Sequence, residues 1–437
     1  MGLSKRIDEY FGVTSNGSTI RTEFQGAVLV FLSIFYLMTI IPSILSSSGM
    51  DYSQAFTATV IVSIVGCLLM GFYAKYPIFQ GPGVGICTFF SYSVVLMMGY
   101  TWQEAMAAMF ISAAIFLLLS FTGIRKKVIE SIPDGLRLGI CAGVGLFIAF
   151  VGLVDSGIIT HGAGSILSLG ELTDVTVLTS LFCIFVTLFL YSMRVPAAVF
   201  IGIISTVVFG ILVGSISIPS ELFELPAMPE VGSFISGIDG GFFDVRMIFI
   251  IFCMVVVQFF EGTASIFAVN EALRKENDEK DFGMALKADA VSATVSAAVG
   301  STPTTSFVES VIGINRGART GLMPVFVAVF LLVSLFIGPI FMMGSFQCTV
   351  GAMLIIGIST FTDLRKIDWD DMPVVISVTV TVVFMIVAYS IADGLALGVI
   401  TYCVCMVGAR RFKEIGPVMY GLAVTLALYL VFNYLML

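Results

Sequence analysis

Charged residues are scarce in this chain of 437 residues, in which Asp, Glu, Lys and Arg together make up only 11%. A soluble domain carries roughly 25% charged residues, because its surface must be solvated. Hydrophobic residues account for 58% of the sequence, and the mean hydropathy is +1.06. A surface of this composition must largely face lipid, which excludes a soluble enzyme, a nucleic-acid binder and a secreted module.

Histidine is almost absent, and cysteine is absent from the polar stretches. The single histidine, His161, lies in a glycine-rich stretch, where we expect an ordinary loop residue. All eight cysteines lie inside apolar stretches, whereas a disulfide framework would place them in loops, so we expect buried free thiols. Cys403 and Cys405 have the wrong spacing for one helix face and no histidine nearby. The sequence therefore predicts no metal site, no cofactor and no enzymatic activity.

Apolar stretches, by contrast, follow one another along most of the chain. A membrane helix needs ~20 mainly apolar residues, and fourteen candidate stretches precede residue 410. They are 24–47, 51–74, 77–98, 102–122, 134–154, 174–192, 195–217, 244–270, 284–300, 303–315, 320–341, 344–361, 372–390 and 393–409. A further stretch, 416–436, is compatible with a membrane crossing or with a position in the membrane interface.

Basic residues orient these stretches, since cytoplasmic loops are enriched in Lys and Arg. The connections on one side contain Lys75, Arg125, Lys126, Lys127, Arg194, Arg274, Lys275, Lys280, Lys287, Arg316, Arg319, Arg365, Lys366, Arg410, Arg411 and Lys413. The connections on the other side contain neither Lys nor Arg. The pattern predicts a multi-pass protein of the cytoplasmic (inner) membrane, with a cytoplasmic N-terminal tail at residues 1–23.

An acidic, proline-containing break at 218–243 divides the chain into two halves, 24–217 and 244–409. Each half has seven stretches, and an odd number makes the two halves run in opposite directions through the membrane, as inverted repeats do. We expect an all-α polytopic membrane protein of fourteen transmembrane segments in a 7+7 inverted repeat, with an extracytoplasmic linker. Residues 410–437 form a basic loop and a C-terminal apolar segment.

The third and tenth stretches do not have the pattern of regular helices. Residues 76–86 include Pro77, Pro82 and three glycines, and residues 300–306 read Gly-Ser-Thr-Pro-Thr-Thr-Ser. Proline removes an N–H donor and clashes within a helix, and an interior glycine weakens regular structure. Non-helical backbone at membrane depth is tolerated only where it lines a cavity or is buried in protein. Paired half-helices with short strands at a central transport site are predicted; two kinked packing helices are the alternative.

Two carboxylates interrupt apolar sequence where water does not account for them. Glu261 follows the run 255–260, which is apolar except for Gln258, and Glu309 comes just after the second broken segment. An ionisable residue at the bilayer centre costs ~2.5–3.5 kcal/mol on insertion scales and usually faces a site. A carboxylate can accept two N–H groups of a planar heterocycle, and in a low-dielectric site it can take up a proton. We expect one to hold substrate and the other to couple transport to a cation; capping of a broken helix end is the alternative.

Other polar residues in these stretches give weaker signals. Gln258 lies about one turn before Glu261 and is predicted to share its helix face, and Ser265, one turn later, is a candidate minor contact. Asp289 is expected to be a structural tie near the cytoplasmic end of its span. Asp393 is expected to serve as a cap or turn residue.

Short motifs occur in a defined order along nearly the whole chain. They are Glu9-Tyr10-Phe11-Gly12, Pro42-Ser43-Ile44-Leu45, Gly81-Pro82-Gly83-Val84-Gly85, Thr122-Gly123-Ile124-Arg125, Ala288-Asp289-Ala290, Thr304-Thr305-Ser306-Phe307-Val308-Glu309-Ser310, Gly317-Ala318-Arg319-Thr320-Gly321-Leu322 and Ser390-Ile391-Ala392-Asp393-Gly394. In this order they resemble the nucleobase:cation symporter-2 (xanthine/uracil permease) superfamily. Within it, the chain is most similar to the azaguanine-resistance-like branch of adenine/guanine/hypoxanthine permeases.

The resemblance implies a core domain that moves against a gate domain in an elevator-like step, within a homodimer. It also implies symport of a purine nucleobase with a proton or sodium ion. The resemblance implies that Glu261 and Glu309 bind the base, with further contacts from Gly85, Ile86 and Cys87. Thr305, Ser306 and Gln258 complete the predicted substrate-binding set, and Glu309, Glu261 and Ser265 form the predicted coupling-ion set.

Three positions depart from the pattern of the branch. Cys87 and Ile41 stand where Asn is usual, and Gln258 stands where an acid is usual. Xanthine, uracil or a related planar heterocycle therefore remains an alternative substrate. An anion transporter on the same architecture is a further alternative, against which the two glutamates argue.

Overall fold

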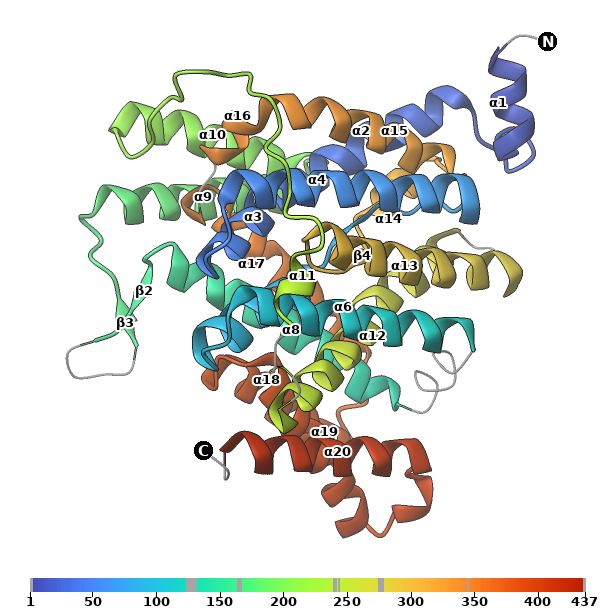
Figure 1. Ribbon diagram of the computed structural model, residues 1–437, viewed down its shortest axis with the longest axis vertical. Coiled ribbons are helices and arrows are strands. Elements are labelled where there is room, and N and C mark those ends of the chain that lie inside the picture. The colour runs from blue at the N-terminus through green and yellow to red at the C-terminus, as the bar shows by residue number, and fades with distance from the viewer. Residues whose placement is uncertain are drawn as a thin grey trace.

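The computed structural model describes residues 3–122, 132–162, 167–238, 242, 244–273, 279–343 and 346–434. In this part of the chain nearly all regular structure is helical, and most of the long helices run in a similar direction (Figure 1). Nine helices among the described residues are long and apolar enough to cross a membrane, and five shorter apolar helices accompany them. The protein is thus a mostly helical, multi-pass membrane protein.

The first half of the chain contains α1 (Leu3–Phe11), α2 (Ile20–Ile34), α3 (Leu37–Ser47), α4 (Tyr52–Leu68), η1 (Leu69–Ala74), β1 (Gln80–Pro82), α5 (Val84–Thr88), η2 (Phe89–Met97), α6 (Trp102–Phe121), α8 (Asp134–Asp155), β2 (Ile159–Thr160), β3 (Ser168–Leu169), α9 (Val175–Ser192), α10 (Ala198–Val213) and α11 (Ser233–Ser236). The second half contains α12 (Val245–Leu273), α13 (Glu279–Val299), β4 (Thr304–Ser306), α14 (Ser310–Arg316), α15 (Leu322–Ser334), η3 (Leu335–Ile337), α16 (Gly338–Met342), α17 (Phe346–Asp363), η4 (Leu364–Lys366), α18 (Met372–Val387), α19 (Ile391–Gly408), η5 (Phe412–Glu414) and α20 (Pro417–Tyr434). Of the basic residues used above for orientation, Arg125, Lys126, Lys127, Arg274 and Lys275 lie outside the described residues.

Capping residues mark the starts of several long helices. The side chains of Thr19, Asp51, Thr101 and Asp174 accept hydrogen bonds from N–H groups in the first turns of α2, α4, α6 and α9. At α6 the N-cap and Glu104 form a complete capping box. The first N–H groups of a helix have no partner within it, so these polar residues fix where each helix begins.

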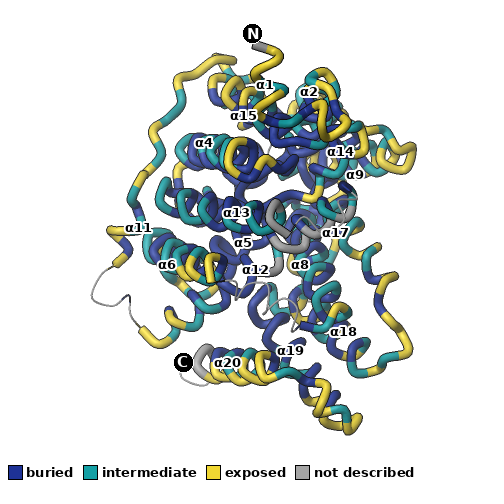
Figure 2. The backbone as a smooth tube through the Cα atoms, turned by 90° about the vertical axis from the view of Figure 1, so that its right-hand side faces the viewer, coloured by how far each residue is buried: buried dark blue, intermediate teal, exposed yellow. Residues whose placement is uncertain are grey.

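The helices pack in two groups. In the first, which we call the core group, α2, α3, α4, α5, η2, α6, α12, α13, α14 and α15 contact one another and surround β1 and β4. In the second, the gate group, α8, α9, α10, α17, α18 and α19 contact one another. Figure 2 shows buried residues along the inner sides of both groups. The boundary between the groups is where the candidate site lies.

The connection between α10 and α12 runs over the outside of the core group as exposed, irregular chain (Figure 2). Its backbone is attached at two points: the N–H of Glu224 donates to the carbonyl of Phe336 at 3.2 Å, and that of Gly232 to the carbonyl of Ala298 at 2.9 Å. This connection corresponds to the acidic break at 218–243, of which 218–238, 242 are described. It joins the gate group to the second half of the core group.

Candidate functional site

The two broken segments of the sequence meet in the core group. β1 pairs antiparallel with β4, so that Gly81 lies opposite Thr305. The ladder is extended at both ends, because the Gly83 N–H donates to the Pro303 carbonyl and the Phe307 N–H donates to the Phe79 carbonyl, each at 3.1 Å. Strand β1 leads into α5 and strand β4 leads towards α14. Short strands and half-helices therefore occupy the positions that the proline, glycine and threonine pattern indicated.

A buried carboxylate ties the two strands to each other. Asp289 of α13, which is 1% exposed, accepts hydrogen bonds from Gln80 Nε2 at 3.0 Å and from Ser306 Oγ at 3.1 Å. Gln80 Nε2 also donates to Ser306 Oγ at 2.7 Å. Asp289 is thus a structural residue beside the paired strands β1 and β4, in the middle of α13 and not near one end of it.

Glu261 projects from α12 onto the first turn of α5. Its Oε1 accepts a hydrogen bond from the Gly85 N–H at 2.8 Å, and its Oε2 accepts one from the Ile86 N–H at 3.1 Å. These N–H groups have no partner within the helix, and the aligned peptide dipoles make a helix N-terminus favourable for an anion. Glu261 therefore caps the half-helix that follows β1.

The glycines at the start of α5 allow this close approach. A Cβ atom at Gly83 would lie 2.7 Å from Glu261 Oε2, which is shorter than any normal contact. A Cβ atom at Gly85 would lie 2.9 Å from Val144 Cγ1 of α8 and 3.3 Å from the Glu261 carboxylate. The Gly-Pro-Gly-Val-Gly motif thus makes room both for the carboxylate and for a gate helix.

Glu309 lies just before α14 in a different environment. Its Oε1 accepts a hydrogen bond from the Tyr36 hydroxyl at 2.9 Å, and Tyr36, between α2 and α3, is 3% exposed. Glu309 makes no side-chain capping bond to α14, every residue of which is described. The adjacent Val308 is 48% exposed, so this segment faces open space.

Both carboxylates line one cavity of about 220 Å³ between the core and gate groups. Ligand pockets for drug-sized molecules are larger, roughly 300–1,000 Å³, so this cavity suits a smaller ligand. The core group contributes Tyr36, Val84, Val257, Glu261, Ser265, Thr305, Ser306, Phe307, Val308 and Glu309, and the gate group contributes Ile140, Cys141, Val144, Gly145, Ile148, Ile356, Thr360, Asp363, Ile391 and Leu395. Apolar walls with a few polar groups are typical of small-molecule sites.

A second, larger cavity of about 690 Å³ adjoins the first. Tyr36, Glu309 and Thr360 line both cavities, and the larger one extends to Arg194, just after α9. Glu309 therefore lies where the two cavities meet. Glu261 lines only the smaller one, which we call the inner cavity.

Apart from Gln258, the predicted site residues fall into three sets in the structure. Glu261, Glu309, Ser265, Thr305 and Ser306 line the inner cavity. Gly85 and Ile86 are not among the described lining residues of the cavity; their backbone N–H groups donate hydrogen bonds to Glu261. Cys87 is fully buried and is not part of the described lining.

Gln258 is a correction to the expected site. Its Nε2 donates to Ser112 Oγ of α6 at 2.9 Å and to the Met254 carbonyl at 3.3 Å, and the side chain is 1% exposed. Gln258 and Glu261 are three positions apart, so their side chains point in directions about 60° apart around the axis of α12. α12 lies between α6 and the cavity. Gln258 consequently faces α6 instead of sharing the cavity face of Glu261.

Tyr36 is a polar lining residue that the sequence pattern did not reveal. It lies six positions before Pro42 in an apolar stretch, and a buried tyrosine hydroxyl usually needs a partner. This requirement was the only sequence signal for Tyr36, and it did not identify Glu309 as the hydrogen-bond partner. Among the described residues, no group of three His, Cys, Asp or Glu side chains could hold a metal ion.

The sequence matches the model of a family described as the permease family over residues 21–397. Guanine/hypoxanthine permease PbuG of Bacillus subtilis is 38% identical to this chain, over 97% of this chain and 99% of the relative. Adenine permease AdeP of Escherichia coli is 30% identical, over 98% of this chain and 96% of the relative. The similarity to both relatives thus covers almost the full length of each chain.

Solved structures show the same fold in proteins of low sequence identity. The transmembrane domain of the cyanobacterial bicarbonate transporter BicA superimposes with a TM-score of 0.63 at 15% identity, covering 89% of this chain and 97% of that one. At this identity the likeness concerns the fold alone.

Proposed function

The chain belongs to the permease family of the nucleobase:cation symporter-2 superfamily, in the branch of guanine/hypoxanthine and adenine permeases, and we propose that it imports a purine base (guanine, hypoxanthine or adenine) together with a cation. One observation carries the proposal: two buried glutamates, Glu261 and Glu309, line a single small cavity between two groups of helices. A carboxylate oxygen accepts N–H groups, which every one of these bases carries. The coupling ion in this proposal is a proton.

Glu309 is the principal base contact in this proposal. One of its oxygens is held by Tyr36, which leaves the other oxygen to accept a ring N–H. Val257 and Ile356 line the same cavity and provide apolar surfaces for the flat faces of the ring. Thr305 and Ser306 of β4 supply polar groups in the cavity lining.

Glu261 has a different role in the proposal. Because both of its oxygens accept N–H groups of α5, its charge holds the half-helix against the cavity. Protonation would remove the charge that favours this contact and would let α5 shift. Glu261 is therefore proposed to link proton binding to the geometry of the site, with Ser265 beside it in the lining.

Transport is proposed to proceed by an elevator-like movement of the core group against the gate group, in a homodimer in the cytoplasmic membrane. The larger cavity reaches Arg194, in a connection whose basic residue predicts a cytoplasmic position. Elsewhere on the boundary, the Tyr92 hydroxyl of η2 donates to Asp155 of α8, which closes the contact between the two groups. We infer that the structure corresponds to a state open towards the cytoplasm.

An uptake panel tests the proposal. Cells lacking their own purine uptake would express this chain and receive labelled adenine, guanine, hypoxanthine, xanthine or uracil at two pH values. We expect one or more of the three purine bases to accumulate, with faster uptake at the lower external pH. Glu171→Gln, which changes an exposed loop carboxylate, serves as a matched control and should transport normally.

Accumulation of xanthine or uracil alone would replace the purine assignment with the alternative heterocycle. Absence of uptake of all five bases, with the protein present in the membrane, would overturn the nucleobase function. Uptake independent of pH but dependent on sodium would replace the proton as coupling ion.

A further inference from the structure

The C-terminal helix α20 runs along α19 in a single antiparallel register. Tyr429 of α20 donates from its hydroxyl to Asp393 Oδ1 of α19 at 3.0 Å, and the Cys403 thiol of α19 donates to the Met419 carbonyl of α20 at 3.9 Å. The two contacts are ten residues apart on each helix, or about 15 Å at the α-helical rise. The helices therefore stay side by side from one end of α19 towards the other.

The length and composition of α20 fit a crossing of the bilayer. Its 18 residues span about 27 Å, close to the ~30 Å hydrocarbon core of a membrane. The sequence Pro417–Tyr434 contains no charged residue. A helix that lies in the interface instead carries a strongly polar, charged face.

Both faces of α20 are apolar. Met419, Leu426 and Tyr429 are at most 2% exposed and pack inwards, while Val424 is 60% and Leu428 is 44% exposed. A helix that is hydrophobic on all sides is either surrounded by protein or crosses a membrane. Since the protein covers only one face here, the outer face requires a hydrocarbon environment.

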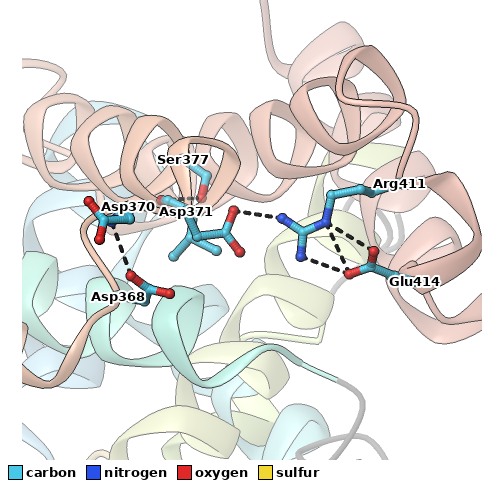
Figure 3. Close-up of polar contacts among 7 residues, drawn as sticks. Asp368, Asp370, Asp371, Ser377, Arg411 and Glu414 are labelled. Atoms are coloured by element: carbon cyan, nitrogen blue, oxygen red, sulfur yellow. Dashed lines mark hydrogen bonds and ion pairs between the residues drawn. The ribbon is translucent and has the colours of Figure 1, made fainter.

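The turn between α19 and α20 is held by one guanidinium group (Figure 3). Arg411 donates to both oxygens of Glu414, at 3.0 Å and 2.7 Å, and to Asp371 Oδ1 at the start of α18 at 2.8 Å. The guanidinium lowers the pKa of the Glu414 carboxyl, so the pair is ionised at neutral pH. This anchored, basic turn reverses the chain direction and starts α20 next to the end of α19.

We infer that α20 is a further transmembrane helix that crosses the bilayer antiparallel to α19 with its outer face against lipid hydrocarbon. The C-terminal end of α20 then lies on the membrane face opposite to the turn between α19 and α20. α20 also contacts α12 of the core group, so it lies beside the boundary between the two groups. The inference does not depend on the transported substrate.

Reporter fusions in a bacterial host test the inference. Alkaline phosphatase is active only outside the cytoplasm and green fluorescent protein fluoresces only inside it. Fused behind Leu437, the phosphatase should be active and the fluorescent protein dark. Fused behind Glu414, before α20, the two reporters should give the opposite result. The fluorescent protein fused before Met1 should be bright and reports the amount of chain made. Fluorescence behind Leu437, with the phosphatase inactive there, would overturn the inference.

A substitution pair tests whether the outer face meets hydrocarbon. Val424→Lys combined with Leu428→Lys places two charges in the middle of that face, where insertion is strongly disfavoured. We expect the phosphatase behind Leu437 to lose most of its activity while the N-terminal fluorescence remains. Val424→Ala with Leu428→Ala is the control and should keep the phosphatase active. Full phosphatase activity with the two lysines would show that the face meets water, which contradicts the inference.

Discussion

Glu261 and Glu309 line the same cavity, yet different parts of the molecule hold them. Glu261 accepts two backbone N–H groups from α5, whereas Glu309 accepts one hydroxyl from Tyr36 and borders the second cavity as well. Backbone groups of a half-helix fix a carboxylate rigidly and depend on its charge, while a single side-chain donor leaves an oxygen available to a ligand. The comparison separates a residue that supports the site from one that contacts what the site binds.

Among the substitutions, Glu261→Gln is expected to have the largest effect on uptake and thermal stability together. The amide can accept at one oxygen only and turns an NH₂ group towards α5, so one buried N–H loses its partner at a cost of ~1–3 kcal/mol. We expect loss of uptake and a lower thermal unfolding midpoint of the purified protein in detergent. An unchanged midpoint would contradict the supporting role of Glu261.

For Glu309→Gln we expect loss of uptake without loss of stability. A hydrogen bond to a charged group contributes ~1.5–3 kcal/mol, which corresponds to roughly a 10–150-fold decrease in apparent affinity for the base. The unfolding midpoint should stay near that of the parent protein, because Tyr36 can still donate to the amide oxygen. Equal destabilisation by both glutamine variants would remove the distinction between the two carboxylates.

Gly83→Ala should reproduce part of the Glu261 effect without touching a carboxylate. The added methyl group would press on Glu261 Oε2, which must then move away from α5. We expect uptake to fall and the unfolding midpoint to decrease, by less than in Glu261→Gln. Gly421→Ala is the matched control, since a Cβ atom there meets nothing within 4 Å; similar losses in both variants would point to a general effect of removing glycine.

Much of this arrangement is visible in the sequence, because it follows from local rules. Pro82 and Pro303 cannot continue a helix, and two carboxylates in apolar sequence indicate a site. The partners of those carboxylates are not local: Glu261 and Gly85 are 176 residues apart, and Tyr36 and Glu309 are 273 apart. The sequence could not decide which glutamate caps a half-helix, because tertiary packing makes that choice.

Helix phase is the second reason for a difference between expectation and structure. The side chains of Gln258 and Glu261 point in directions only about 60° apart around α12, which is compatible with one shared face. Because α12 lies between α6 and the cavity, this difference is enough to place Gln258 against α6 and Glu261 in the cavity. Gln258 Nε2 instead donates to Ser112 Oγ on the side of α12 that faces α6. The direction in which a buried helix faces is set by neighbours that periodicity does not identify.

The smallest effect is expected for Tyr36→Phe, which removes only the hydroxyl that holds Glu309. A neutral hydrogen bond contributes ~0.5–1.5 kcal/mol and one to a charged group somewhat more, so uptake affinity should fall by about 3–20-fold. In the Glu309→Gln background the same change should have less effect, because the charged acceptor is already absent. A double-mutant cycle of uptake affinities measures this coupling. Strict additivity of the two substitutions would mean that Tyr36 acts on the base or on packing independently of Glu309.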